Sequence, residues 1–229
     1  MSETHTALVV GASRGLGLGL AAELRRRDWN VIATVRDEAG ARRLSTEAPG
    51  VRVERLDITE AAAVADLRRK LDGEAFDLVF VNAGISPPGR GDAAQVSLDQ
   101  AATVFVTNAI APARLARLFL GRLRQPNGVV AFMSSGLGSV ADNTHGYSEL
   151  YSASKAALNS LSRSLAATLG GRRITVLAIA PGWVRTDMGG AGAPLSVEES
   201  VRGIVDVLEA RAGSGRHGFV DHRGRELPW

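Results

Sequence analysis

Short apolar runs alternate with longer amphipathic stretches along the whole 229-residue chain. Seven short runs, most of them apolar at consecutive positions rather than at every second one, are typical of strands buried on both faces of a parallel sheet. They cover Thr6–Val10, Asn30–Val35, Val51–Leu56, Leu78–Val81, Val129–Ser134, Ile174–Ile179 and His217–Val220. Helical periodicity predicts helices over 15–27, 38–47, 60–71, 98–124, 150–169 and 197–210.

Alternating strands and helices predict the α/β class with right-handed crossovers. We expect residues 1–229 to form a single doubly wound Rossmann-type domain with a mostly parallel seven-stranded sheet, because no linker or repeat divides the chain. Glycine clusters at 11–19, 84–91, 136–138 and 189–192 follow predicted strands. Doubly wound sheets bind ligands at that edge, so the clusters indicate where the site lies.

The composition excludes several classes of function. The chain has no cysteine, which rules out disulfides, thiolate metal sites and a cysteine nucleophile. Its four histidines lack metal-ligand spacing, so we expect no metal.

The net charge is only +3 and the basic run Arg25–Arg27 closes a helix, so we expect no nucleic-acid partner. A polar start and the lack of an apolar run of about 18 residues predict a cytoplasmic protein without signal peptide or membrane span.

A glycine-rich turn follows the first strand and opens the first helix: Gly11-Ala12-Ser13-Arg14-Gly15-Leu16-Gly17. Such glycines let backbone N–H groups approach a pyrophosphate at a helix N-terminus. The spacing differs from the usual G-x-G-x-x-G, and by itself the turn is equally explained as a tight connection. Its position after the first strand favours a dinucleotide site.

The end of the second strand bears on which dinucleotide binds. NAD sites usually place an acidic residue there, against the ribose 2′-OH. This strand ends in Val35-Arg36, and Arg36 with Arg14 suits a 2′-phosphate. Asp37 follows directly, and both arginines are also explained as solvated surface residues. We expect NADPH (NADP+) as the cofactor, with NADH the less favoured alternative.

Acid–base chemistry is indicated at Tyr151 and Lys155, which are four residues apart and share a helical face. An ammonium group beside a phenol, together with a nicotinamide cation, lowers the phenol pKa toward the working range. Ser135, with Ser134 as the alternative, ends a strand where a hydroxyl can bind a carbonyl oxygen. Tyr151 and Lys155 are also explained as an exposed pair of residues on a helix surface. Ser134 and Ser135 are also explained as residues that favour a turn. A serine hydrolase is disfavoured because no G-x-S-x-G occurs.

Together these motifs resemble the short-chain dehydrogenase/reductase family over essentially the full chain. The resemblance rests on the turn Gly11–Gly17, Leu56-Asp57-Ile58-Thr59, Asn82-Ala83-Gly84, Asn108, Ser135, Tyr151-x-x-x-Lys155 and Pro181-Gly182-Trp183-Val184-Arg185-Thr186. The segments Val140–Tyr151 and Asp221–Trp229 are most similar to the compact C-factor-like carbonyl reductases. Val10 and Val81 depart from residues frequent in the family, and neither change removes a catalytic group.

The resemblance implies a role for each motif. The catalytic set is Asn108, Ser135, Tyr151 and Lys155: Tyr151 donates a proton to a carbonyl oxygen held by Ser135, Lys155 binds the nicotinamide ribose, and Asn108 holds a water in a proton relay. The implied cofactor-binding residues are Gly11, Ser13, Arg14, Gly15, Leu16, Gly17, Arg36, Asp57, Ile58, Asn82, Ala83, Gly84, Tyr151, Lys155, Pro181, Gly182, Val184 and Thr186. Asp57 binds the adenine, Asn82–Gly84 the adenosine ribose, and Pro181–Thr186 the nicotinamide.

We expect a small-molecule carbonyl or alcohol substrate, in a pocket walled by the loops 85–96, 136–149 and 187–196. The expected apolar lining is Leu137, Val140, Trp183 and Met188, and the polar side is Asn143, His145 and Tyr147. The last loop is rich in glycine, which suits a mobile lid. Two rivals stay open: a cofactor-binding regulator without turnover, and an NAD-linked alcohol dehydrogenase. The helices 98–124 and 150–169 commonly form dimer interfaces in the family, so the resemblance implies a homodimer or homotetramer.

Overall fold

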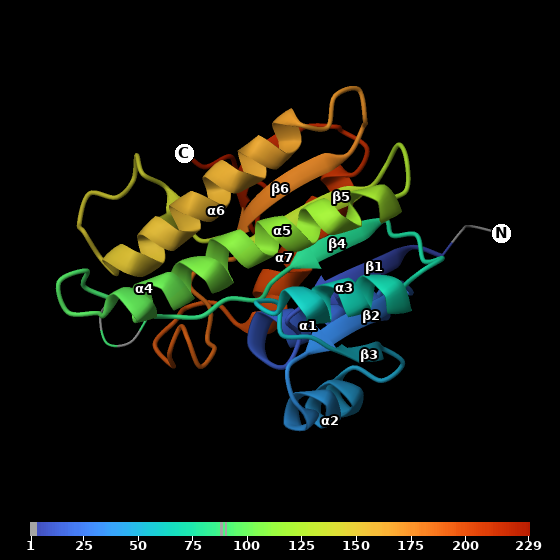
Figure 1. The fold of residues 1–229 in the computed structure, drawn as a ribbon, viewed down its shortest axis with the longest axis horizontal. Coiled ribbons are helices and arrows are strands. Elements are labelled where there is room, and N and C mark those ends of the chain that lie inside the picture. Colours follow the sequence, from blue (N-terminus) through green and yellow to red (C-terminus); the bar gives the residue numbers. More distant parts are fainter. Residues whose placement is uncertain (1–3, 88, 90) are drawn as a thin grey trace.

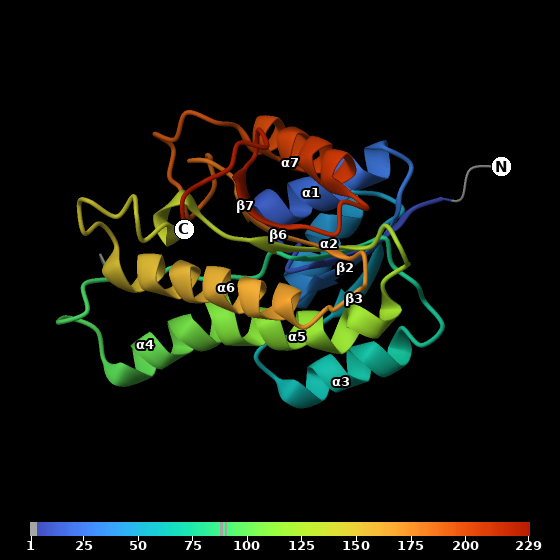
Figure 2. The same cartoon turned by 90° about the horizontal axis from the view of Figure 1, so that it is seen from above.

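The computed structural model describes residues 4–87, 89 and 91–229 and has helices on both faces of one seven-stranded sheet (Figures 1 and 2). The strands are β1 (Thr6–Val10), β2 (Asn30–Val35), β3 (Arg52–Arg55), β4 (Leu78–Val81), β5 (Val129–Met133), β6 (Thr175–Ala180) and β7 (His217–Asp221). Their order is β3-β2-β1-β4-β5-β6-β7 and every neighbouring pair is parallel. The predicted α/β, doubly wound fold is therefore confirmed, with a fully rather than mostly parallel sheet.

The helices form two layers. They are α1 (Gly15–Arg26), α2 (Glu38–Glu47), α3 (Ala61–Lys70), α4 (Leu98–Phe105), α5 (Ala111–Phe119), α6 (Glu149–Ala167) and α7 (Val197–Arg211). Figure 2 shows α1 and α7 on one face of the sheet and α3, α5 and α6 on the other. Capping boxes formed by Ser97 and Ser196 fix the N-termini of α4 and α7.

Side-chain alternation along each strand divides the core between the two faces. In β1, Ala7 and Val9 pack with α1 and α7, whereas Leu8 and Val10 pack with α3, α5 and α6. Both sets are completely or almost completely buried, which explains why the strand sequence is apolar at every position. The edge strand β3 is the exception, because its residues, which include Arg52, Glu54 and Arg55, are half-buried or exposed. It is also shorter than the predicted Val51–Leu56.

The single helix predicted over 98–124 is wrong in detail. The segment consists of α4, a π-helical turn η1 (Val106–Ile110), α5 and a short 3-10 turn η2 (Leu120–Arg122). A π turn holds an extra residue per turn and shifts the side chains that follow it. Here it contains the buried residues Asn108 and Ala109, so the distortion occurs at a predicted site residue.

The run Leu98–Arg122 is long and apolar enough to span a membrane by length and composition, with a mean hydropathy of 1.2. This differs from the expectation that no apolar run approaches that length. Half of its apolar window is buried within the structure, against the sheet and α6. A helix that covers a sheet needs such an apolar face, so the fold itself accounts for the composition.

The carboxyl ends of the strands meet on the left of Figure 1, beside the start of α6. The turn after β1, the segment after β4, the turn after β5 and the loop after β6 all emerge there. All predicted site motifs therefore lie at this edge of the sheet or beside it, where doubly wound sheets bind ligands.

Candidate active site

Two glycines of the turn after β1, Gly11 and Gly17, are packed too closely against other backbone to be replaced by a residue with a side chain. A Cβ on Gly17 would lie 2.1 Å from the Gly11 carbonyl oxygen and 2.5 Å from Asn82 Nδ2. A Cβ on Gly11, whose φ is +90°, would lie 2.8 Å from the backbone of Ala83. Asn82 Nδ2 donates a hydrogen bond of 2.6 Å to the Gly11 carbonyl. The sequence motifs at 11–17 and 82–84 thus form one cradle of backbone, of the kind that approaches a pyrophosphate.

The charges near this turn differ from the expected pair of arginines. Arg14 forms an exposed ion pair of 2.5 Å with Asp187, in the loop after β6. Arg36 is exposed at the end of β2 and helps to lower the pKa of Asp57. The structure does not show the two guanidinium groups in contact. A third arginine, Arg43 of α2, donates 3.3 Å to the Ser13 carbonyl and was missed because helical periodicity only marks it as exposed.

Asp37, which left the choice of cofactor open in the sequence, caps α2. Its carboxylate accepts a 2.7 Å hydrogen bond from the Gly40 backbone N–H, and the residue has the extended backbone of an N-cap. One oxygen of the Asp37 carboxylate is thus engaged in capping α2, and the carboxylate keeps further acceptor capacity.

After β3, the exposed Asp57 accepts hydrogen bonds from the backbone and hydroxyl of Thr59, at 2.9 and 2.6 Å. These bonds are the main cause that holds the pKa of Asp57 below its usual range. Ile58 beside it is buried. The arrangement presents a carboxylate next to an apolar side chain, the pair predicted to meet an adenine.

Tyr151 and Lys155 lie on one face of α6, next to Ser135 at the end of β5. The Ser135 hydroxyl is hydrogen-bonded to the Tyr151 phenol, and Lys155 Nζ lies 5.6 Å from the centre of the Tyr151 ring. Lys155 is 3 % exposed and donates 2.8 Å to the Met133 carbonyl. Three predicted catalytic residues are thus brought together, whereas the alternative Ser134 points to Asn159.

The pKa of Tyr151 is raised in the structure, whereas the sequence led us to expect a lowered pKa. Burial raises the pKa of Tyr151 to about 12, and the Ser135 hydrogen bond offsets only part of this. Burial also lowers the pKa of Lys155 to about 8. Desolvation disfavours both charged forms, so the chain alone holds the phenol as a neutral proton donor.

Lys155→Met is expected to stabilise the cofactor-free protein at neutral pH while removing activity. The folded-state pKa of about 8 lies below the ordinary lysine pKa of 10.5, so burial of the ammonium costs stability below pH 8. The variant should be more stable at pH 7 by on the order of 1–3 kcal/mol, because the lost bond to Met133 offsets part of the gain. Urea unfolding should show this advantage shrinking as the pH rises from 8 to 10.5. A variant that is less stable than wild type at pH 7 would contradict the assignment.

Asn108 is completely buried in the π turn, and its side chain forms hydrogen bonds to Ile85 and Ser154. Its Oδ1 accepts a hydrogen bond of 2.8 Å from the Ile85 N–H. Its Nδ2 donates one hydrogen bond of 2.9 Å to the Ile85 carbonyl and another of 3.0 Å to Ser154 Oγ. These bonds engage both ends of the Asn108 amide, and the role of Asn108 in holding a water stays a prediction. A Cβ on Gly84 would lie 3.3 Å from Asn108 Oδ1 and 3.4 Å from Lys155 Nζ. The amide thus connects the segment after β4 to the catalytic face of α6.

The loop after β6 closes the site from the side of α7. Pro181 and Val184 are buried, and the Pro181 carbonyl accepts 2.7 Å from Ser200 of α7. A Cβ on Gly182, whose φ is +83°, would meet Leu195 at 2.5 Å. Thr186 lies against the glycine turn, since a Cβ on Gly15 would be 3.4 Å from its Cγ2. The motif at 181–186 and the turn at 11–17 therefore face each other.

The loop 187–196, predicted as a mobile lid, is tied down by hydrogen bonds. Trp183 Nε1 donates 2.8 Å to the Gly189 carbonyl, and Arg185 donates 2.9 and 2.7 Å to the carbonyls of Ala193 and Pro194. With the Arg14–Asp187 pair, these bonds hold the loop against the glycine turn. Asp187 was missed because its partner is 173 residues away in sequence.

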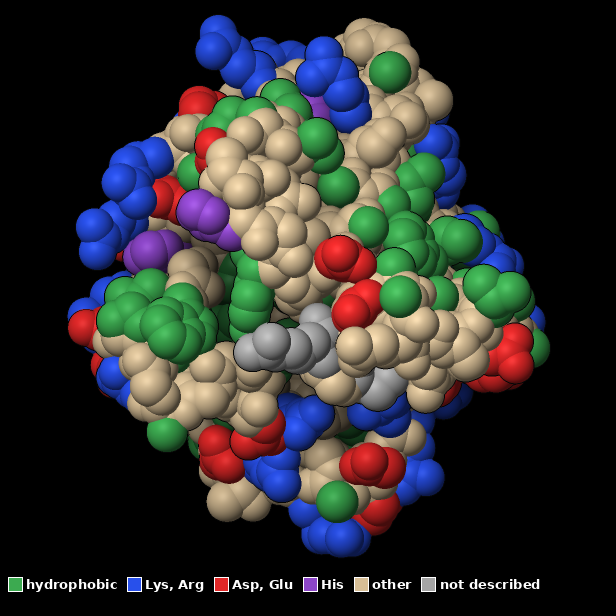
Figure 3. All heavy atoms as spheres, turned by 90° about the vertical axis from the view of Figure 1, so that its left-hand side faces the viewer, with side chains coloured by type: hydrophobic (Ala, Val, Ile, Leu, Met, Phe, Trp, Pro, Cys, Tyr) green, Lys and Arg blue, Asp and Glu red, His purple; other side chains and the backbone are tan. Residues whose placement is uncertain are grey.

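The rim of the site is largely apolar. Figure 3 views this end of the molecule, and patches of hydrophobic side chains are visible on it. Exposed large apolar residues of the predicted walls are Leu137, Val140, Tyr147, Trp183 and Met188. Of the third wall, 85–96, positions 88 and 90 lie outside the described residues.

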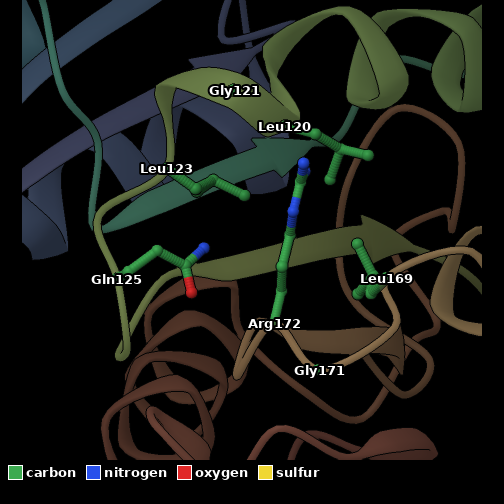
Figure 4. Close-up of a pocket in the computed structure, with 7 residues that line it drawn as sticks. All are labelled: Leu120, Gly121, Leu123, Gln125, Leu169, Gly171 and Arg172. Atoms are coloured by element: carbon green, nitrogen blue, oxygen red, sulfur yellow. The ribbon is translucent and has the colours of Figure 1, made fainter.

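Three of the predicted lining residues border a hollow beside α6. Leu137, Val140 and Asn143 line a hollow of about 360 Å³ with Ala153 and Ala156 of α6. Helical spacing places those alanines on a different side of α6 from the catalytic pair. Another hollow, of about 640 Å³, lies at the amino ends of β5 and β6, where Arg172 extends toward Leu120 (Figure 4). Neither hollow contains a predicted catalytic residue.

Comparison with known proteins gives consistent similarities. A family model described as enoyl-(acyl carrier protein) reductase matches residues 11–216. The C-signal protein of Myxococcus xanthus is 38% identical over 158 residues, which cover 67% of this chain and 92% of that protein. The 3-oxoacyl-(acyl-carrier-protein) reductase FabG of Escherichia coli is 30% identical over 193 residues, covering 81% of this chain and 76% of FabG.

Solved structures are similar over almost the entire chain. A short-chain dehydrogenase/reductase from Burkholderia multivorans with bound NADP has a TM-score of 0.94 and 43% identity, covering 99% of this chain and 100% of that one. A carbonyl reductase from Pseudomonas aeruginosa PAO1 in complex with NADP has a TM-score of 0.90 and 43% identity, with the same coverage. The match thus includes the site as well as the fold.

Proposed function

Because the chain belongs to the short-chain dehydrogenase/reductase family, we propose that it is an NADPH-dependent oxidoreductase that reduces an aldehyde or ketone to an alcohol. The observation that carries this proposal is the meeting of Tyr151, Ser135 and Lys155 at the carboxyl edge of the sheet. A phenol, a hydroxyl and an ammonium group in contact are what proton transfer to a carbonyl oxygen requires.

The residues present fit a nicotinamide dinucleotide, because the backbone cradle of Gly11, Gly17 and Ala83 leaves no room for side chains. When bound, NADPH supplies the hydride. Ser135 donates a hydrogen bond to the substrate carbonyl oxygen, and Tyr151 transfers its phenolic proton to that oxygen. Lys155 binds the nicotinamide ribose next to Tyr151. Asn108 would hold a water that resupplies the proton.

The protonation of Tyr151 suits donation of a proton to a carbonyl oxygen. In the cofactor-free protein, a phenol with a pKa of about 12 is protonated throughout the neutral range. Alcohol oxidation uses the same residue as a phenolate base, a form that burial disfavours until the cofactor binds. The NAD-linked alcohol dehydrogenase is therefore separated from the reductase by the cofactor that the protein prefers. A cofactor-binding regulator needs none of these acid–base groups.

The preference for NADPH is supported by the three arginines at 14, 36 and 43 near the turn. Similar proteins with bound NADP support the same choice. We expect Arg36→Ala to raise the KM for NADPH about 10-fold, since a charge-assisted phosphate contact contributes about 1.5–3 kcal/mol. The KM for NADH, which lacks the phosphate, should stay within about twofold. Equal losses for both cofactors would contradict a 2′-phosphate role.

We further propose a cytoplasmic homodimer or homotetramer that acts on small molecules. The exposed faces of η1 and α5 include Val106, Ile110 and Leu118. Exposed apolar side chains on neighbouring helices suit contact with a second copy. Light scattering of the purified protein measures this state directly.

The experiment that tests the function is NADPH oxidation over a panel of free aldehydes, ketones and diketones. We expect turnover of apolar carbonyl compounds, because the rim of the site is apolar. NADPH binding without turnover of any compound in the panel would favour the regulator instead.

A further inference from the structure

We propose that Asn159 is a positioning residue that fixes Ser135 opposite Tyr151, a role that rests on the proposed carbonyl reductase function. Asn159 follows Tyr151 and Lys155 at the same spacing of four residues, so the three side chains form one stripe along α6. The first two meet the substrate and cofactor in the proposed mechanism. Asn159 instead contacts the strand end that carries the catalytic serine.

The Asn159 amide holds the chain on both sides of Ser135. Its Oδ1 accepts a 2.6 Å hydrogen bond from Ser134 Oγ, and its Nδ2 donates 3.1 Å to the Gly138 carbonyl. Asn159 is 3 % exposed and Ser134 is 2 % exposed. Buried polar pairs of this kind are costly to break, because a lost partner leaves the other group unsatisfied.

The turn after β5 lies directly on α6 at this point. A Cβ on Gly138 would lie 3.0 Å from Asn159 Nδ2 and 3.1 Å from the Lys155 backbone. Within the turn, Ser135 Oγ accepts 3.1 Å from the Leu137 N–H, and the Ser135 carbonyl accepts 2.9 Å from the Gly138 N–H. The position of the Ser135 hydroxyl therefore depends on the Gly138 carbonyl that Asn159 holds.

Lys155 and Asn159 attach successive parts of the same segment to α6. Lys155 Nζ binds the Met133 carbonyl, and Asn159 binds Ser134 and Gly138. Tyr151 is carried by the same helix. The distance between the Ser135 hydroxyl and the Tyr151 phenol is thus set by side chains of α6. A displacement of about 1 Å in such a pair costs on the order of 100-fold in rate.

Asn159→Leu removes both hydrogen bonds at similar volume, and Ser134→Ala removes only one. We expect the first to lower kcat for carbonyl reduction about 10- to 100-fold and the second about 3- to 10-fold, with the Kd for NADPH within about twofold. Ser162→Ala is the matched control. Ser162 is equally buried on α6 and binds the Asn159 carbonyl and His217, but it does not touch the turn. Its kcat should stay within about twofold of wild type.

A double-mutant cycle with Ser135→Ala separates positioning from general destabilisation. If Asn159 acts through Ser135, Asn159→Leu should have little further effect on kcat once Ser135 is alanine. A full additional loss in that background would overturn the proposal, as would a folded Asn159→Leu protein with wild-type kcat. A wild-type chain that reduces no carbonyl compound would refute the proposed function and this role together.

Discussion

Tyr151→Phe lowers kcat for carbonyl reduction about 10²- to 10⁴-fold, which is the expected contribution of a positioned general acid. The change removes only the phenolic oxygen and leaves the ring against Lys155. The Kd for NADPH should therefore remain within about threefold, because no backbone contact of the glycine turn is altered. Stopped-flow measurement of NADPH oxidation and a fluorescence titration of NADPH binding check the two parts separately.

Tyr147→Phe is the control for that result. It changes the only other tyrosine in the chain, which is four residues earlier and well exposed, without a lysine four residues later. Its kcat should match wild type. If Tyr151→Phe retained wild-type kcat, or Tyr147→Phe lost it, the assignment of the acid would be wrong.

Gly17→Ala weakens NADPH binding about 10- to 100-fold. The new Cβ would lie 2.1 Å from the Gly11 carbonyl and 2.5 Å from Asn82 Nδ2, so the turn and the segment after β4 must separate. Forcing extra atoms into close packing costs about 1–3 kcal/mol, which corresponds to that range of affinity. NADPH titration measures the loss, and thermal unfolding reports the accompanying decrease in stability.

Gly121→Ala is the matched control, because a Cβ at Gly121 meets nothing within 4 Å. It lies in η2, at the opposite end of the sheet from the site. Unchanged NADPH affinity in both variants would show that the cradle at Gly17 does not contact the cofactor.

Most of the fold could be predicted because burial on both faces produces an unbroken apolar run, as in β1, β4 and β6. The edge strand β3 was predicted too long because Val51 and Leu56, which flank it, pack in the core without belonging to the strand. The π turn around Asn108 could not be predicted, since one inserted residue hardly changes an apolar periodicity. What it changes is the direction in which the residues after it point.

The candidate site was predicted where chemistry follows from local spacing, as for Tyr151 and Lys155. It was not predicted where the outcome depends on burial or distant contacts. The raised pKa of Tyr151 results from desolvation, which the sequence does not specify. The Arg14–Asp187 pair joins residues far apart in the chain. Asn159 lay in the recognised helix, but its partners at the end of β5 are defined only by the packing of that turn.

Transfer of deuterium from NADPH that carries deuterium in place of both hydrogens at nicotinamide C4 tests the central claim most directly. The purified protein is incubated with the labelled cofactor and the best carbonyl compound of the panel, and the alcohol is analysed by mass spectrometry. We predict one deuterium on the carbinol carbon for each NADPH consumed, and no transfer with Tyr151→Phe in the same time. An alcohol without deuterium, or bound NADPH that no carbonyl compound oxidises, would contradict the account.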